Sequence, residues 1–206
     1  MKTDSGFGKP IRLRERLRGE TQAAILAAAE RVFAEEGLDR ARMESIAARA
    51  GVAVGTLYNH FEDREALLRA LVRDHRAALL ARLDAALAAG GGRPLEEALR
   101  VFLAALFDHW EAHRGLVALL FQVSMPGRTA RERGALVDEV VRRAEAILAR
   151  GWSEGSLRPD EAGVQGAMLV GMARGVLVQD MIRDGGSARV DGPGRVLEVF
   201  LRGAGR

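Results

Sequence analysis

Apolar residues recur at helical spacing along nearly the whole chain. The first such set precedes a stop at Gly37 and comprises Ile25, Ala28, Ala29, Val32 and Phe33. The sequence shows neither a convincing strand pattern, alternating between apolar and polar residues, nor an internal repeat. The pattern therefore predicts an all-α protein, with a small N-terminal bundle joined to a larger C-terminal bundle.

Caps and breaks divide this pattern into separate helices. Thr21 suits the N-cap of the first helix, Asp63 suits the cap of the fourth, and Pro94 suits the first position of the fifth. Further breaks are expected at Pro126, Pro159, Gly185, Gly186 and Pro193. The predicted helices cover about 21–36, 43–50, 54–60, 63 to the glycines at 90–92, 94–112, 115–123, 129–150, 160–184 and 194–203.

The stretch 45–61, SIAARAGVAVGTLYNHF, reads as two short helices on either side of Gly51. Two such helices cross at a steep angle when a small residue lies at the crossing and the turn accepts a positive φ. Ala47 is the small residue and Gly51 the turn. The inner face is supplied by Ile46, Ala50, Val52 and Leu57. This pattern indicates a helix-turn-helix at about 42–61, whose second helix lies in the DNA major groove.

The second short helix leaves several polar groups on its outer side. Leu57 faces inward, and the residues on or near the exposed side are Val54, Gly55, Thr56, Tyr58, Asn59 and His60. Thr56 and Asn59 suit base edges, whereas Tyr58 and His60 suit phosphate oxygens. Taken singly, a glycine cap or a tyrosine is more often explained by packing. The combination favours DNA binding.

Basic residues are concentrated at the N-terminus. Residues 1–18 hold six basic side chains and only two acidic ones, whereas the formal net charge of all 206 residues is +3. The basic residues are Lys2, Lys9, Arg12, Arg14, Arg16 and Arg18. With Gly6, Gly8 and Pro10 to keep it irregular, residues 1–17 are expected to form a flexible basic arm. Such an arm reaches phosphates or a minor groove, or serves as a solubilising tail.

Composition narrows the class of protein further. The chain has no cysteine, which excludes disulfides and thiolate metal sites and fits a reducing cytoplasm. Because its apolar runs are short, we expect neither a signal peptide nor a membrane span, and hence a cytoplasmic protein. No glycine-rich phosphate loop, serine elbow or separated carboxylate pair points to an enzyme, and no cofactor is expected.

The run from Ile25 to Leu67 resembles the N-terminal domain of TetR-type transcriptional regulators. The matching pieces are Ala28, Phe33 and Gly37, then Ile46-Ala47-x-x-Ala50-Gly51-Val52, Gly55-Thr56-Leu57-Tyr58-x-x-Phe61 and Arg64-Glu65-x-Leu67. These spacings extend over roughly 45 residues, far more than a generic helix-turn-helix match. Two positions depart from the family pattern, because Arg42 and Ala53 stand where Ser or Thr usually caps the next helix. A lost capping oxygen costs about 1 kcal/mol.

The resemblance implies a homodimeric repressor that a small-molecule effector releases from a palindromic operator. It implies a DNA-binding domain at about 18–78 and a ligand-binding and dimerisation domain at 79–206. By the same similarity, Tyr58, His60 and Arg64 contact phosphate, and Arg42 is a further candidate. The residues expected near bases are Val54, Gly55, Thr56 and Asn59.

The C-terminal half offers a dimer surface and a weaker candidate pocket. Small residues that allow close helix packing are Gly163, Gly166, Ala167, Gly171 and Gly175. Together with the apolar helix at 194–203, they are expected to form a four-helix dimer interface about a two-fold axis. Candidate ligand-binding residues are Phe102, Leu106, Phe107, Trp110, Phe121, Met125, Met168 and Met172. Each of these, taken alone, is more often ordinary core.

His109 and His113 form the remaining candidate site. They lie four residues apart on one helical face, a spacing that can chelate zinc. No further ligand cluster is evident in the sequence, so we expect a surface or core pair and no metal. The alternative function is a helical small-molecule-binding or catalytic protein that uses the region of these two histidines.

Overall fold

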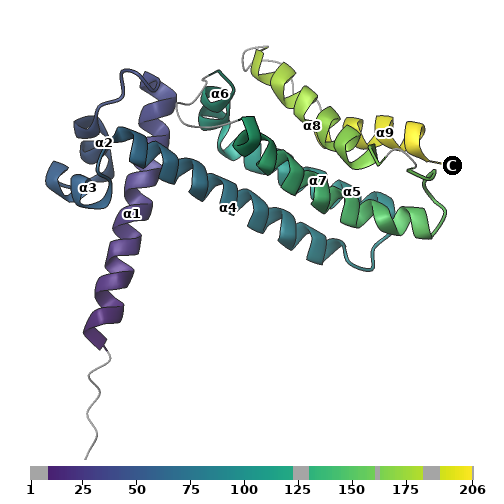
Figure 1. Cartoon of the computed structure of the whole chain (residues 1–206), viewed down its shortest axis with the longest axis horizontal. Coiled ribbons are helices and arrows are strands. Elements are labelled where there is room, and N and C mark those ends of the chain that lie inside the picture. Colours follow the sequence, from purple (N-terminus) through teal and green to yellow (C-terminus); the bar gives the residue numbers. More distant parts are fainter. Residues whose placement is uncertain (1–8, 123–129, 161–162, 183–190, 206) are drawn as a thin grey trace, which may run out of the picture. The chain divides into compact units, whose positions relative to one another are not determined.

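The computed structural model describes residues 9–122, 130–160, 163–182 and 191–205. Over these ranges the chain consists of helices and short connections, with one isolated antiparallel bridge between Leu157 and Gly205 (Figure 1). The predicted all-α class is confirmed. The helices divide into two compact units, residues 1–74 and 75–206, and the division falls inside α4 (Arg64–Gly90).

The first unit contains three helices and the beginning of α4. They are α1 (Lys9–Glu36), α2 (Met43–Ala50) and α3 (Val54–His60). α1 packs on α2, and α2 packs on α3 (Figure 1). The fully buried side chains of this unit include Ile25, Val32, Phe33, Ile46, Leu57 and Leu67. Burying each such side chain contributes about 1.5–3 kcal/mol, which stabilises two helices that are too short to form alone.

The helix α1 begins earlier than predicted. Thr21 is not its N-cap but lies in the helix interior, where its hydroxyl donates to a backbone carbonyl one turn earlier. The prediction of an irregular arm over 1–17 is therefore wrong from Lys9 onward, and residues 1–8 lie outside the described residues. The arginines of this segment are good helix formers. Pro10 stands in the first turn, where its missing N–H costs no hydrogen bond.

The second unit contains the rest of α4 and five further helices. They are α5 (Leu95–Ala112), α6 (Arg114–Gln122), α7 (Ala130–Ser153), α8 (Gln165–Ile182) and α9 (Gly192–Ala204). α5 packs against α7 and α9, while α8 packs against α7 and α9 (Figure 1). Apolar side chains of α4, α5, α7, α8 and α9 form one continuous core, which includes Leu83, Phe102, Leu148, Leu169 and Phe200. No described helix is both long and apolar enough to cross a membrane.

Several helix boundaries in the second unit differ from the predicted ones. Pro94 is the N-cap of α5 instead of its first residue, and Pro193 lies in the first turn of α9 instead of breaking a helix. α8 begins at Gln165 instead of about 160, because the carboxylate of Asp160 accepts the backbone N–H groups of Val164 and Gln165 at 3.0 and 2.9 Å. The predicted breaks at Pro126, Gly185 and Gly186 lie outside the described residues.

Candidate functional site

The turn between α2 and α3 has the geometry that its glycine predicts. Gly51 has φ +69° and ψ +27°, in the left-handed region that favours glycine. The N–H of Gly51 donates to Ala48 O at 3.2 Å, and the N–H of Val52 donates to Ala47 O at 3.0 Å. These two bonds form a Schellman motif, which satisfies the last carbonyls of α2 and allows α3 to start at once in a new direction.

The helix α3 presents one face to solvent. Its single fully buried residue is Leu57, and Phe61, just beyond the helix, is also buried. Val54, Gly55 and Asn59 are exposed, Thr56 and His60 are half-buried, and the Tyr58 side chain is 47% exposed. Apart from Arg42 and Arg64, the residues that the sequence assigned to base edges and phosphates therefore share one short helix. None of them is needed to fill the core of the unit.

Both short helices lack the side-chain cap that their positions favour. Arg42 and Ala53 occupy the N-caps of α2 and α3 in extended conformation, and neither makes a capping hydrogen bond through its side chain. Each helix therefore lacks about 1 kcal/mol of stabilisation that a capping oxygen would contribute. The following helix is capped as predicted, since Asp63 Oδ1 accepts the N–H of Ala66 at 2.6 Å.

Two arginines of the first unit are already engaged in contacts within it. Arg49 on α2 donates to Glu35 on α1 at 2.5 Å, and this hydrogen bond lowers the pKa of Glu35. Arg64 Nη1 donates to the carbonyls of Leu38 at 2.6 Å and Asp39 at 3.1 Å. A phosphate contact by Arg64 stays a prediction, because the side chain here holds the loop between α1 and α2.

Comparison with known families explains this arrangement. Residues 25–71 match the model described as bacterial regulatory proteins, tetR family, and this range covers the helix-turn-helix and the core beneath it. Residues 25–71 therefore form a tetR-family domain. The sequence resemblance to TetR-type regulators is thereby confirmed.

Individual tetR-family relatives match over different lengths. The repressor BepR of Brucella suis is 43% identical over 53 residues, which are 26% of this chain and 25% of BepR. The repressor KstR2 of Mycolicibacterium smegmatis is 29% identical over 148 residues, 66% of this chain and 67% of KstR2. The match to BepR thus spans about a quarter of that relative's length.

A solved structure extends the similarity to both units. The transcriptional regulator FadR of Bacillus subtilis, crystallised with stearoyl-CoA, superimposes with a TM-score of 0.72 at 22% identity. The match covers 88% of this chain and 98% of FadR. At this identity the likeness concerns the fold alone. The second unit therefore shares the fold of the corresponding part of FadR.

Five of the predicted ligand-binding residues lie in or against the core of the second unit. Phe102 and Leu106 are fully buried core residues, and Phe107, Trp110 and Met172 pack partly buried against that core. Met168 is 57% exposed in the single chain, and its role in ligand binding stays a prediction. The side chain of Phe121 and all of Met125 lie outside the described residues.

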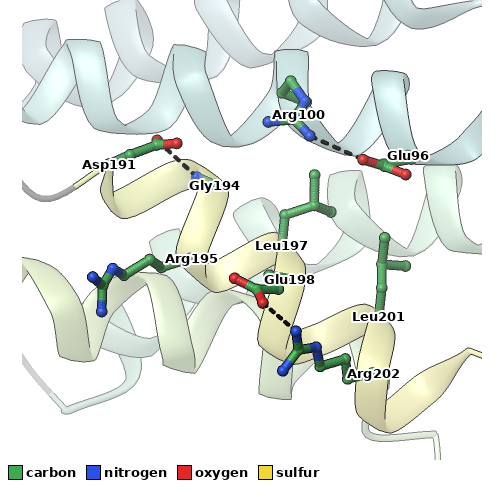
Figure 2. Close-up of a pocket in the computed structure, with 9 residues that line it drawn as sticks. All are labelled: Glu96, Arg100, Asp191, Gly194, Arg195, Leu197, Glu198, Leu201 and Arg202. Carbon is green, nitrogen blue, oxygen red and sulfur yellow. Dashed lines mark hydrogen bonds and ion pairs between the residues drawn. The ribbon is translucent and has the colours of Figure 1, made fainter.

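A hollow of about 680 Å³ lies instead on the surface where α5 and α9 meet. Figure 2 shows that its residues come from these two helices and from the N-cap of α9, and that most carry charge: Glu96, Arg100, Asp191, Gly194, Arg195, Leu197, Glu198, Leu201 and Arg202. Arg100 pairs with Glu96 at 2.9 Å and Arg202 with Glu198 at 2.6 Å. This hollow is polar and does not include any residue predicted for the effector.

Three histidines of the second unit lie together in its interior. His75 on α4, His109 on α5 and His113 directly after α5 have ring centroids 4.5–4.8 Å apart. Burial lowers the pKa of His75 to about 3, and the electrostatic effect of His109 and His113 contributes to the same shift. Burial, His113 and Arg82 lower the pKa of His109 to about 4.

His75 was not among the site residues predicted from the sequence. A signal was present, because His75 falls on the apolar stripe of α4 between Leu71 and Leu79, four residues from each, where an apolar side chain is expected. A histidine on such a stripe is buried and needs polar partners. Its proximity to His109 and His113 follows from the packing of α4 beside α5, which no local spacing reveals.

Proposed function

We propose that this chain is a dimeric, ligand-responsive transcriptional regulator that binds a palindromic DNA operator, acting as a repressor that a small-molecule effector releases. The observation that carries the proposal is the exposed polar face of α3, positioned by the left-handed turn at Gly51 within a family-specific helix-turn-helix. Relatives named as repressors support the same assignment. A regulator of this class acts in the cytoplasm and catalyses no reaction.

The α3 residues divide into two roles under this proposal. Thr56 and Asn59 read base edges, and Gly55 allows the backbone to approach the duplex closely because it has no side chain. Tyr58 and His60 bind phosphate oxygens and set the register on the duplex. Arg42 adds a charge at the start of α2, where it is exposed. The exposed arginines at the start of α1 add a contact that does not depend on base sequence.

The dimer is proposed to form through α8 and α9. Three apolar side chains on these helices face solvent in the single chain: Val164 beside the start of α8, Met168, and Val199, which is 60% exposed. Apart from the backbone of their own helix, no atom of the described residues lies within 4 Å of the place where a Cβ of Gly171 or Gly175 would lie. An apolar face with open space above its glycines suits the close approach of the same helices from a second copy.

The effector is proposed to be a small molecule bound by the second unit. FadR of Bacillus subtilis, which shares the fold, was crystallised with stearoyl-CoA. The apolar interior of this unit, with Phe107 and Trp110 only partly buried, supports an effector with an apolar portion. The family match does not favour the alternative of a catalytic protein built around His109 and His113.

Selection of bound DNA from genomic fragments tests the proposal. The purified full-length chain should recover an inverted repeat whose half-site centres are one or more helical turns apart. Recovery of fragments without any dyad would contradict the proposal.

Tyr58 provides the matched variants for the recovered site. Tyr58→Ala should weaken operator binding by at least about tenfold. Tyr58→Phe removes the hydroxyl and keeps the ring, so it separates the contributions of these two groups to binding. Both variants should keep the helical circular dichroism of the parent, because the side chain is exposed. Unchanged affinity in Tyr58→Ala would remove this residue from the interface.

A further inference from the structure

The histidine cluster of the second unit has the geometry of a metal site. His75, His109 and His113 each offer one ring nitrogen, and these atoms all lie within 4.8 Å of one another. In a tetrahedral site with metal–nitrogen bonds of about 2.0–2.1 Å, ligand nitrogens are roughly 3.3 Å apart. The three nitrogens must therefore approach one another by at most roughly 1.5 Å to bind one ion.

Burial indicates that two of these nitrogens need a partner. The Nδ1 of His75 and the Nε2 of His109 are buried and have no hydrogen-bond partner within the part of the chain that the structure describes. His75 is only 8% exposed and His109 only 1%. Proteins rarely leave such atoms unsatisfied, so a bound species is the expected explanation. A metal ion would satisfy both atoms at once. A buried water would also satisfy them, but it would not make the protein bind added metal.

The chemistry of the cluster restricts the class of metal. Neutral imidazole suits zinc, nickel, copper and cobalt, and the group contains no carboxylate of the kind that calcium and magnesium require. Burial keeps the pKa of His75 and of His109 low, so both rings are neutral at pH 7 and need not lose a proton to bind. The positive charge of Arg82 disfavours a cation near His109. An anion as an additional ligand would offset this repulsion.

We propose that His75, His109 and His113 together bind one divalent transition-metal ion of the Zn²⁺ class, linking α4 to α5. Three protein ligands leave a fourth tetrahedral position for water or an anionic ligand. This site goes beyond DNA binding and does not depend on it, because every ligand belongs to the second unit.

Metal titration of the full-length chain tests the proposal directly. The protein is prepared without a histidine tag, stripped with a chelator and titrated with Co²⁺, whose visible absorption reports four-coordinate nitrogen ligation. Zn²⁺ is then added to displace it. We expect one equivalent of metal per chain, and a melting temperature that rises with Zn²⁺ because the metal binds the folded state.

The chain supplies a matched control for this titration. It contains four histidines, and the fourth, His60, lies on α3 in the other unit. His60→Ala should bind metal as the parent does. His113→Ala should weaken Co²⁺ and Zn²⁺ binding by at least about tenfold, the loss typical of a disturbed metal site. His113 is only half-buried, so its removal should leave the circular dichroism unchanged. His75→Leu and His109→Leu should also lose binding while keeping the apolar packing.

Two results would overturn the assignment. One is a parent chain that binds no stoichiometric metal at a tenfold excess of Co²⁺ or Zn²⁺, which would leave water as the partner of the buried nitrogens. The other is binding that survives in folded His113→Ala or disappears in His60→Ala, which would place the metal elsewhere. Neither result would bear on operator binding, which is measured with DNA in the presence of chelator.

Discussion

The imidazole rings of His75 on α4 and His109 on α5 lie with their centroids 4.5 Å apart and their planes at 40°. Both rings are buried, and each has a nitrogen without a partner among the described residues. Leaving such an atom unsatisfied costs about 1–3 kcal/mol. Because burial also lowers the pKa of both rings, the pair makes the stability of the second unit sensitive to pH.

The metal-free protein is expected to lose stability as the pH falls below about 6.5. An unfolded histidine has a pKa of about 6.5. In the folded chain the pKa is lowered to about 3 for His75 and about 4 for His109. Between these values the unfolded chain binds more protons than the folded chain, so the free energy of unfolding decreases with decreasing pH. Above pH 7 the two neutral histidines make their full contribution to the free energy of unfolding. By pH 5 the free energy of unfolding has fallen by on the order of 2–4 kcal/mol.

Chemical denaturation at a series of pH values, in the presence of chelator, measures this effect. His109→Leu should flatten the pH dependence between about 5 and 7, because it removes one of the two buried titrating groups. A parent chain whose unfolding free energy is constant over this range would show that the buried pair does not control its acid stability.

Two glycines of the helix-turn-helix are expected to respond in opposite ways to alanine. Gly51→Ala places a side chain at φ +69° and should lower the free energy of unfolding by about 1 kcal/mol. Gly55 lies inside α3 with open space around its Cβ position, so Gly55→Ala should leave stability unchanged or raise it by up to about 1 kcal/mol. Denaturant melts measure both changes.

The same substitution at Gly55 should nevertheless weaken operator binding. The added methyl group lies on the face proposed to approach the duplex, where the backbone must come close to the DNA. We expect a loss of at least about tenfold in affinity for the selected operator, equal to about 1.4 kcal/mol. If Gly55→Ala binds as tightly as the parent, the close approach of α3 at this position is refuted.

A large side chain at Gly175 is expected to break the dimer without unfolding the chain. Beyond its own helix backbone, the Cβ position meets no atom of the described residues within 4 Å, so Gly175→Leu fits the single chain but occupies the space proposed for the partner's helix. Gly134 on α7 has equally open space and provides the control as Gly134→Leu. Sedimentation should show a dimer for the parent and the control, and a larger monomer fraction for Gly175→Leu. An unchanged dimer would exclude the α8 surface as the interface.

The helical fold and the DNA-reading element were predictable because both depend on local rules. The period of apolar residues predicted α2 and α3 to the residue, and Gly51 predicted the turn, because only its lack of a side chain permits the left-handed conformation. The outward face of α3 follows from the same period, since Leu57 and Phe61 must point inward. The start of α1 was missed because Pro10 was interpreted as a breaker, although it is compatible with the first turn of a helix.

By itself, the sequence determined the all-α class, the helix-turn-helix and the residues on its outer face, because helix period, turn chemistry and capping act over a few residues. Only the tertiary structure decided which of the apolar residues of the C-terminal half are core, that Met168 faces solvent, and that Arg64 binds the loop carbonyls. It also decided that His75 joins His109 and His113. These outcomes depend on which helix faces pack together, and side chains 34 residues apart meet only when two helices lie side by side.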